Sequence, residues 1–139
     1  MSFLPVYLDS SAIVKLVVPE PETDALRSSL GRWPDRLSSA LARVEVHRAL
    51  RRAGASRAVR ARADAVLSGL VLIRIDDRVL SHACSFKEPM LRALDAIHLA
   101  SALSLGDDPE AFMTYDARLA RAAANLRLHV QHPGIQQLA

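Results

Sequence analysis

The chain has 139 residues, half of them hydrophobic, a net charge of +3 and one cysteine, Cys84. This length is typical of a single domain with one core, and one cysteine excludes an internal disulfide or a cysteine-based metal cage. We expect one domain over residues 1–139 in a reducing, cytoplasmic setting, because neither a secretion signal nor a membrane-spanning apolar stretch is present in the sequence.

Short apolar stretches alternate with helical patterns along the first half of the chain. Residues 3–8 predict a buried strand, and residues 12–18 and 21–30 predict helices. Residues 36–39 predict a short strand. Ser39 is a favourable N-cap for a helix over residues 40–53, and a further helix is expected over residues 56–68.

The same alternation continues in the second half. Residues 70–75 predict a strand because they combine an apolar run with three β-branched side chains. Asp76 is expected to cap a helix to residue 86, and a long helix is expected over residues 90–105. A strand over 111–115, a helix from Asp116 to residue 124 and a last strand over 128–130 complete the pattern. It predicts an α/β fold with a parallel sheet covered on both faces.

Four acids stand where a carboxylate can act chemically: Asp9, Glu45, Asp95 and Asp116. Asp9 and Asp116 directly follow predicted strands, and open parallel sheets bind ligands at the carboxyl ends of their strands. Glu45 and Asp95 lie on largely apolar helical stripes, where a charge is costly unless it is paired.

Structural roles remain open for all four acids at this point. The two that follow strands could be helix N-caps and nothing more. Glu45 could form a solvated pair with Arg48, and Asp95 has Arg92 three residues before it. Spacing alone does not establish that the four side chains meet.

If the carboxylates converge, they raise one another's pKa by repulsion, and a divalent cation removes that conflict. Mg²⁺ and Mn²⁺ prefer oxygen ligands. Such a cation can activate a water for attack on phosphorus and stabilise the leaving oxygen. A converging set of acids would therefore suit metal-dependent hydrolysis of a phosphodiester, but the spacing alone leaves convergence open.

Four segments carry a resemblance to a known family. They are Tyr-Leu-Asp-Ser-Ser-Ala at residues 7–12, Ser-Ser-Ala-Leu-Ala-Arg-Val-Glu at 38–45, Leu-Asp-Ala-Ile-His-Leu-Ala at 94–100 and Met-Thr-Tyr-Asp-Ala-Arg-Leu at 113–119. In this order they resemble the motif blocks of PIN-domain nucleases. The compact chain is similar to the VapC toxins of bacterial toxin–antitoxin pairs.

The resemblance implies a three-layer α/β/α fold with a central parallel sheet of four or five strands. It also implies an endoribonuclease that uses Mg²⁺, or Mn²⁺, and whose toxin members cleave RNA to inhibit translation. A cognate antitoxin covering the active site and a homodimer are implied as partners.

Matched motif by motif, the resemblance makes Asp9, Glu45 and Asp95 the main catalytic and metal-binding acids and Asp116 the fourth. The hydroxyl of Ser11 is expected beside the first acid. Ser38 and Ser39 could each fill the hydroxyl position of the second block.

Arginine outnumbers lysine sixteen to two, and seven arginines fall between residues 43 and 62. Guanidinium groups bind phosphate through paired hydrogen bonds, so this run, with Arg51 and Arg52, is a candidate RNA surface. A solvated helical face is the alternative. For His98, one helical turn after Asp95, a satisfied core histidine is favoured over a place beside the acids.

Three other functions compete with a toxin nuclease. A PIN nuclease of housekeeping RNA processing would have the same acids. The presence of all four acids argues against an inactive PIN-like binding domain. A receiver-like signalling module would need paired acids after its first strand and a late lysine. Asp9 has no acidic neighbour, and the last lysine is Lys87.

Overall fold

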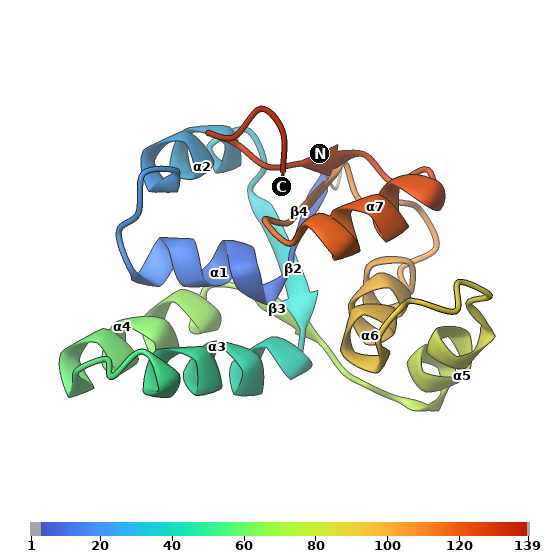
Figure 1. The fold of residues 1–139 in the computed structure, drawn as a ribbon, viewed down its shortest axis with the longest axis horizontal. Helices are drawn as coiled ribbons and strands as arrows, with labels where there is room; N and C mark the ends of the chain where they lie inside the picture. Colours follow the sequence, from blue (N-terminus) through green and yellow to red (C-terminus); the bar gives the residue numbers. More distant parts are fainter. Residues whose placement is uncertain (1–3, 139) are drawn as a thin grey trace.

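The computed structural model describes residues 4–138, in which seven helices and five strands alternate (Figure 1). In chain order they are β1 (Pro5–Leu8), α1 (Ser10–Val17), α2 (Thr23–Leu30), β2 (Asp35–Ser39), α3 (Leu41–Arg52), α4 (Arg57–Ser68), β3 (Val71–Ile73), α5 (Asp77–Ser85), α6 (Ala93–Ala102), β4 (Ala111–Met113), α7 (Ala117–Asn125) and β5 (Val130–Gln131).

All five strands are parallel, in the order β3-β2-β1-β4-β5. The predicted α/β class and its parallel sheet are therefore confirmed. Strand order reverses at β1, which pairs with β2 on one side and β4 on the other. Leu8, the last residue of β1, lies opposite Met113, the last residue of β4. The carboxyl ends of these two central strands thus meet at the switch point, where open sheets bind ligands.

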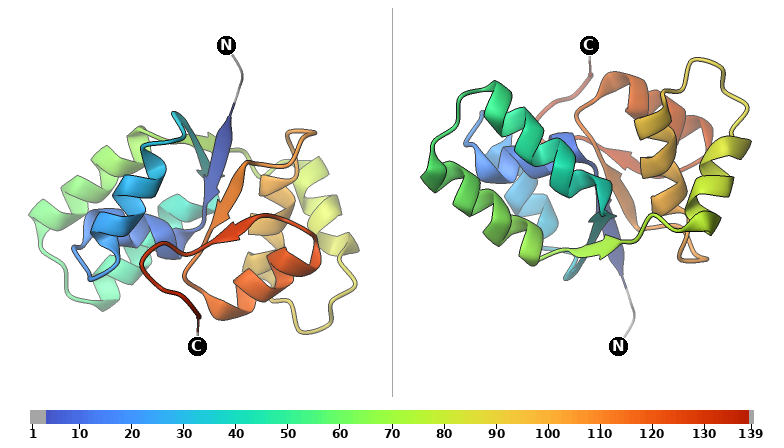
Figure 2. Two further views of the ribbon diagram at one scale, coloured as in Figure 1. Left: turned by 90° about the horizontal axis from the view of Figure 1, so that it is seen from above. Right: turned by 90° about the horizontal axis from the view of Figure 1, so that it is seen from below.

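Helices cover both faces of the sheet, which gives three layers (Figures 1 and 2). Val6 and Leu8 point into a core cluster with α1, α2, α3 and α4, whereas Tyr7 points into a second cluster with α6 and α7. This alternation follows from the period of two along a strand. Because both faces are buried, β1 and β4 are apolar without a break.

Several predicted elements are shorter than expected; the strand expected over residues 111–115, for example, spans Ala111–Met113. Two further cases have a clear cause. The helix expected over residues 90–105 spans Ala93–Ala102, because Arg92 is extended (φ −74°, ψ 156°) and the turns after Ala102 lead to Gly106 at φ +89°. The strand expected over residues 70–75 is reduced to Val71–Ile73, because this edge strand pairs with β2 alone over three residues. No helix within residues 4–138 is long and apolar enough to cross a bilayer.

Candidate active site

The four predicted acids come from four different elements around the switch point. Asp9 directly follows β1, and Asp116 stands three residues after the end of β4. Glu45 lies in the second turn of α3, which begins directly beyond β2, and Asp95 lies in the first turn of α6. Hydrogen bonds and ion pairs link three of these acids through neighbouring side chains. Glu45 is held separately, by Ser10 and His98.

Asp9 is almost fully buried, with 3% of its surface exposed. Its Oδ1 accepts hydrogen bonds from the Ser11 hydroxyl (2.7 Å) and the Ala12 backbone N–H (2.9 Å), and its Oδ2 accepts one from the Thr114 hydroxyl (2.6 Å). Burial raises the pKa of Asp9, and His98 and these hydrogen bonds only partly oppose that rise. Asp9 does cap α1, but a helix cap at the surface does not need a buried carboxylate.

Glu45 is held by a hydroxyl and a histidine. Its Oε1 accepts a hydrogen bond from Ser10 Oγ (2.5 Å) and lies 2.6 Å from His98 Nε2. Burial works against ionisation of Glu45, but the contacts with His98 and Ser10 outweigh it and hold the pKa below its usual value. The alternative pairing with Arg48 is wrong, because the carboxylate turns toward α6 instead.

His98 is itself buried between two partners. Its Nδ1 lies 2.8 Å from the Tyr7 hydroxyl, and only 2% of the residue is exposed. An ionised Glu45 accepts hydrogen bonds but donates none, so Nε2 carries a proton and donates a hydrogen bond to Glu45. In the neutral ring, Nδ1 then accepts from Tyr7. His98 is buried in the core as predicted, but it also bonds one of the acids, so the alternative that the sequence disfavoured holds as well.

A single guanidinium joins the other two acids. Arg92 Nε lies 3.2 Å from Asp95 Oδ2, and Arg92 Nη2 lies 3.3 Å from Asp116 Oδ2. Asp95 is 7% exposed, so its charge is paired with a cation as its apolar stripe requires. Asp116 also caps α7 by accepting from the Arg118 and Leu119 backbone N–H groups.

Thr114 connects the first acid to the fourth. Its hydroxyl donates to Asp9 Oδ2 (2.6 Å) and accepts from the Asp116 backbone N–H (3.0 Å). Next to it, the Tyr115 backbone N–H donates to Ser11 Oγ (2.9 Å). The loops after β1 and β4 are therefore tied together at the point where their acids stand.

Each acid is thus bonded to donors of the protein itself. Within residues 4–138, no group of three or more His, Cys, Asp and Glu side chains lies close enough to hold a metal ion. The donor set nevertheless suits Mg²⁺ or Mn²⁺, since all four acids offer oxygen. Arg92 already places one positive charge between two of them.

The arginine run of residues 43–62 is only partly available for a ligand. Arg60 donates to the Ala55 carbonyl and Arg62 to the Val17 carbonyl, so both guanidinium groups serve the fold. Arg51 and Arg52 are exposed in the last turn of α3. They lie roughly 10 Å beyond Glu45 along the helix axis, at 1.5 Å per residue.

Several residues of this edge were missed by the sequence reasoning. Ser11 does bond the first acid, as predicted, but the contact of Ser10 with Glu45 and that of Thr114 with Asp9 were not foreseen. The available signals were the two adjacent serines after Asp9 and a threonine two residues before Asp116. The Tyr7–His98 contact spans 91 residues and has no local signal.

Comparison with known proteins gives a consistent relationship. Residues 6–125 match the model of the PIN domain family. The chain is 51% identical over 128 residues to ribonuclease VapC46 of Mycobacterium tuberculosis, covering 92% of this chain and 97% of that protein. It is 37% identical over 133 residues to ribonuclease VapC47 of the same species, covering 93% and 97%.

Solved structures agree on the fold. The structure of VapC20 from Mycobacterium tuberculosis, described as a sarcin-ricin loop cleaving toxin, aligns with a TM-score of 0.68 at 17% identity, over 84% of this chain and 94% of that one. VapBC2 from Rickettsia felis, bound to a DNA fragment from its promoter, aligns with a TM-score of 0.73 at 12% identity, over 94% and 99%.

Proposed function

This chain belongs to the PIN-domain family, and from that membership we propose that it is a metal-dependent endoribonuclease of the VapC type. The observation that carries the proposal is a set of three carboxylates at the β1/β4 switch point, Asp9, Asp95 and Asp116, which are linked through Thr114 and Arg92. Glu45 is held separately, through Ser10, the residue that follows Asp9. An acid set of this kind, open to solvent beside Asp116, suits cleavage of a phosphodiester.

Asp9, Glu45 and Asp95 are the residues we assign to hold Mg²⁺ or Mn²⁺, with Asp116 as the fourth acid. The bound cation would lower the pKa of a water and stabilise the charge that develops on the leaving oxygen. The protein's own part is positioning: Ser11 and Thr114 fix the Asp9 carboxylate.

The donor network also sets the charge of the site. Ser10 and His98 keep Glu45 ionised, because their hydrogen bonds favour the charged form. Tyr7 holds the His98 ring in one orientation, so the proton on Nε2 points at Glu45. Arg92 screens Asp95 from Asp116 and supplies a positive charge beside the position of the scissile phosphate.

The biological role follows from the relatives. We propose that the protein is the toxin of a toxin–antitoxin pair, acting in the cytoplasm on RNA needed for translation. A cognate antitoxin would cover the acidic edge, and a homodimer is the expected assembly. Arg51 and Arg52 stay a predicted RNA surface. A short gene directly upstream encoding a DNA-binding protein would favour this role over housekeeping RNA processing.

Cleavage by the purified protein tests the proposal. We expect the protein to cut cellular RNA in the presence of Mg²⁺ and to stop when a chelator is added. Asp9→Asn and Asp95→Asn should each abolish cutting, because each removes a negative oxygen ligand while preserving shape. Thermal unfolding of both variants serves as the control for folding.

Two outcomes would count against the proposal. Cutting that persists in chelator would remove the metal from the mechanism. If both variants cut as well as the wild-type protein, the carboxylates are assigned to the wrong role. If the protein does cut RNA, sequencing of RNA ends from cells that briefly express it would identify the substrate.

A further inference from the structure

An arginine-lined hollow adjoins the acids. Arg92, Arg118 and Arg121 line it together with Asp116 and Ala117, and its volume is about 350 Å³. Since Arg92 is itself bonded to Asp95 and Asp116, the hollow begins at the acidic centre. Positive charge therefore continues from this centre onto α7.

Arg118 and Arg121 are free to bind a ligand. Both are exposed, and they stand three residues apart on α7, which places them on one face with Cβ atoms roughly 5–6 Å apart. Within residues 4–138 neither guanidinium takes part in an ion pair. Nor does either guanidinium, within these residues, donate a hydrogen bond to a backbone carbonyl as Arg62 does.

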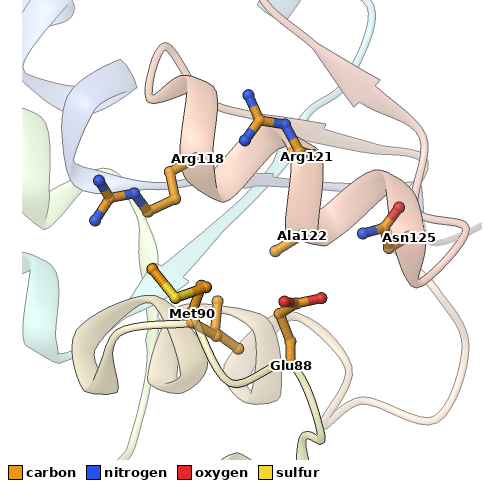
Figure 3. A pocket seen from close by; sticks show the side chains of 7 residues that line it. Glu88, Met90, Arg118, Arg121, Ala122 and Asn125 are labelled. Carbon is orange, nitrogen blue, oxygen red and sulfur yellow. The ribbon is translucent and has the colours of Figure 1, made fainter.

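The same two arginines line an adjoining groove with an apolar floor (Figure 3). Its walls are α7 and the segment that precedes α6. Met90, Leu91 and Ala122 form the apolar part, and 74% of Met90 is exposed. Glu88 stands across the groove from α7 (Figure 3). The surface thus leads from the acids through two free cations to an apolar floor.

We propose that this groove holds the single-stranded RNA segment that flanks the scissile bond, an inference that rests on the proposed ribonuclease function. Arg118 and Arg121 bind backbone phosphates, since a guanidinium binds phosphate through two parallel hydrogen bonds. Met90 and Leu91 contact bases or riboses through apolar surface, and methionine adapts to ligands of different shape. The Glu88 carboxylate repels phosphates, so the backbone stays on the α7 side.

The location of the groove beside the acids favours RNA over an acidic peptide as its occupant. A strand that is cut at the acidic centre has to enter and leave across neighbouring surface. The Arg118–Arg121 face is contiguous with that centre through Arg92 and Asp116. Arg51 and Arg52 lie roughly 10 Å along α3 from Glu45, so they would contact a more distant part of the substrate.

Binding of a short fluorescein-labelled single-stranded RNA tests the inference. It is measured by anisotropy in chelator, where cutting is not expected, over a series of salt concentrations. Replacing Arg118 and Arg121 together by Gln should raise Kd about tenfold or more and reduce the slope of log K against log salt by about 1.4, which is about 0.7 for each phosphate contact. Because both side chains are exposed, thermal unfolding should not change.

A charge-matched control replaces Arg27 and Arg32 by Gln on α2 and the turn that follows it, where both residues are exposed. Its RNA binding should stay near that of the wild-type protein. An equal loss in this control would overturn the inference, because net charge alone would then explain the effect. So would an unchanged α7 variant beside a large loss on replacing Arg51 and Arg52 by Gln.

A polyglutamate peptide provides a further arm. If the α7 variant keeps RNA binding but loses binding of the peptide, the groove is a protein-binding surface and the inference is wrong.

Cutting by the wild-type protein separates the proposed groove from the proposed ribonuclease function. Normal cutting with unaltered RNA binding by the α7 variant refutes the groove alone. RNA binding through Arg118 and Arg121 without any Mg²⁺-dependent cutting refutes the ribonuclease alone.

Discussion

Arg92 is the residue whose replacement should change stability and metal response in opposite directions. Its guanidinium contacts Asp95 at 3.2 Å and Asp116 at 3.3 Å, and 57% of its side chain is exposed. In Arg92→Gln the charge is lost while the length of the side chain is largely kept. The two carboxylates then lose their shared counter-ion.

The magnitude follows from how exposed the partners are. An exposed ion pair contributes about 0.2–1 kcal/mol to stability. The Asp116 side chain is 33% exposed, so the contribution of its pair with Arg92 falls in that range. The Asp95 side chain is 10% exposed, so its pair lies at or above the upper end. Together the loss should be about 1–2 kcal/mol in chelator, which lowers Tm by roughly 3–8 °C for a chain of this size.

Mn²⁺ should then stabilise the variant more than the wild-type protein, because the cation no longer competes with Arg92 for Asp95. Stabilisation by a ligand grows as RT ln(1 + [L]/Kd), so tighter binding appears as a larger rise in Tm. Thermal unfolding with chelator and with Mn²⁺ measures both quantities. Arg32→Gln, at an exposed position in the turn after α2, is the matched control and should change neither.

Two results would refute this reasoning. Arg92→Gln could be as stable as the wild-type protein in chelator, which would mean that the two contacts contribute nothing. Mn²⁺ could also raise the Tm of both proteins equally, and Arg92 would then not stand in for the cation.

Three further changes test other parts of the site. Burial raises the pKa of Asp9, so the folded state binds its proton more tightly than the unfolded chain. Wild-type stability should therefore fall as pH rises from about 3.9 to the folded-state pKa, and Asp9→Asn should remove this fall and be slightly more stable at neutral pH without metal. Tyr7→Phe should cost about 1–2 kcal/mol in urea unfolding, because buried His98 Nδ1 loses its partner. Asp116→Asn should slow RNA cutting less than Asp95→Asn, since Asp116 is the more exposed acid and capping alone can explain it.

Each of these has a contrary outcome. If Asp9→Asn follows the wild-type pH dependence, the buried carboxyl does not oppose folding. An unchanged stability of Tyr7→Phe would mean that the contact between the Tyr7 hydroxyl and His98 Nδ1 contributes nothing to folding. If Asp116→Asn abolishes cutting while Asp95→Asn does not, the ranking of the acids is reversed.

Local pattern was sufficient to predict most of the fold. Apolar runs located the central strands, and Asp9, Asp76 and Asp116 were readable as helix N-caps because each is followed by a helical pattern. The order of the strands in the sheet could not be predicted, since it depends on pairing between distant segments of the chain. The edge strand Val71–Ile73 was overestimated because an apolar run does not reveal how many neighbours the strand will have.

In the candidate site too, the positions of the acids could be predicted from local pattern, whereas most of their bonding partners could not. Asp9 and Asp116 were placed at the sheet edge from their positions after strands, and Asp95 was recognised because its helical neighbours are apolar. The partners were harder to identify. Glu45 bonds His98, which is 53 residues away, rather than Arg48 on its own helix. Arg92 was noted beside Asp95, but its second contact with Asp116 exists only because α6 and α7 begin at the same edge.

The most direct test of the account is to locate Mn²⁺ in crystals of the protein by anomalous scattering. We predict one or more peaks at the β1/β4 edge in contact with carboxylate oxygens of Asp9 and Asp95, with the Arg92 guanidinium moved away from Asp95. Mn²⁺ bound elsewhere, with Asp9 and Asp95 keeping their present partners, would contradict the assignment of this edge as the catalytic metal centre.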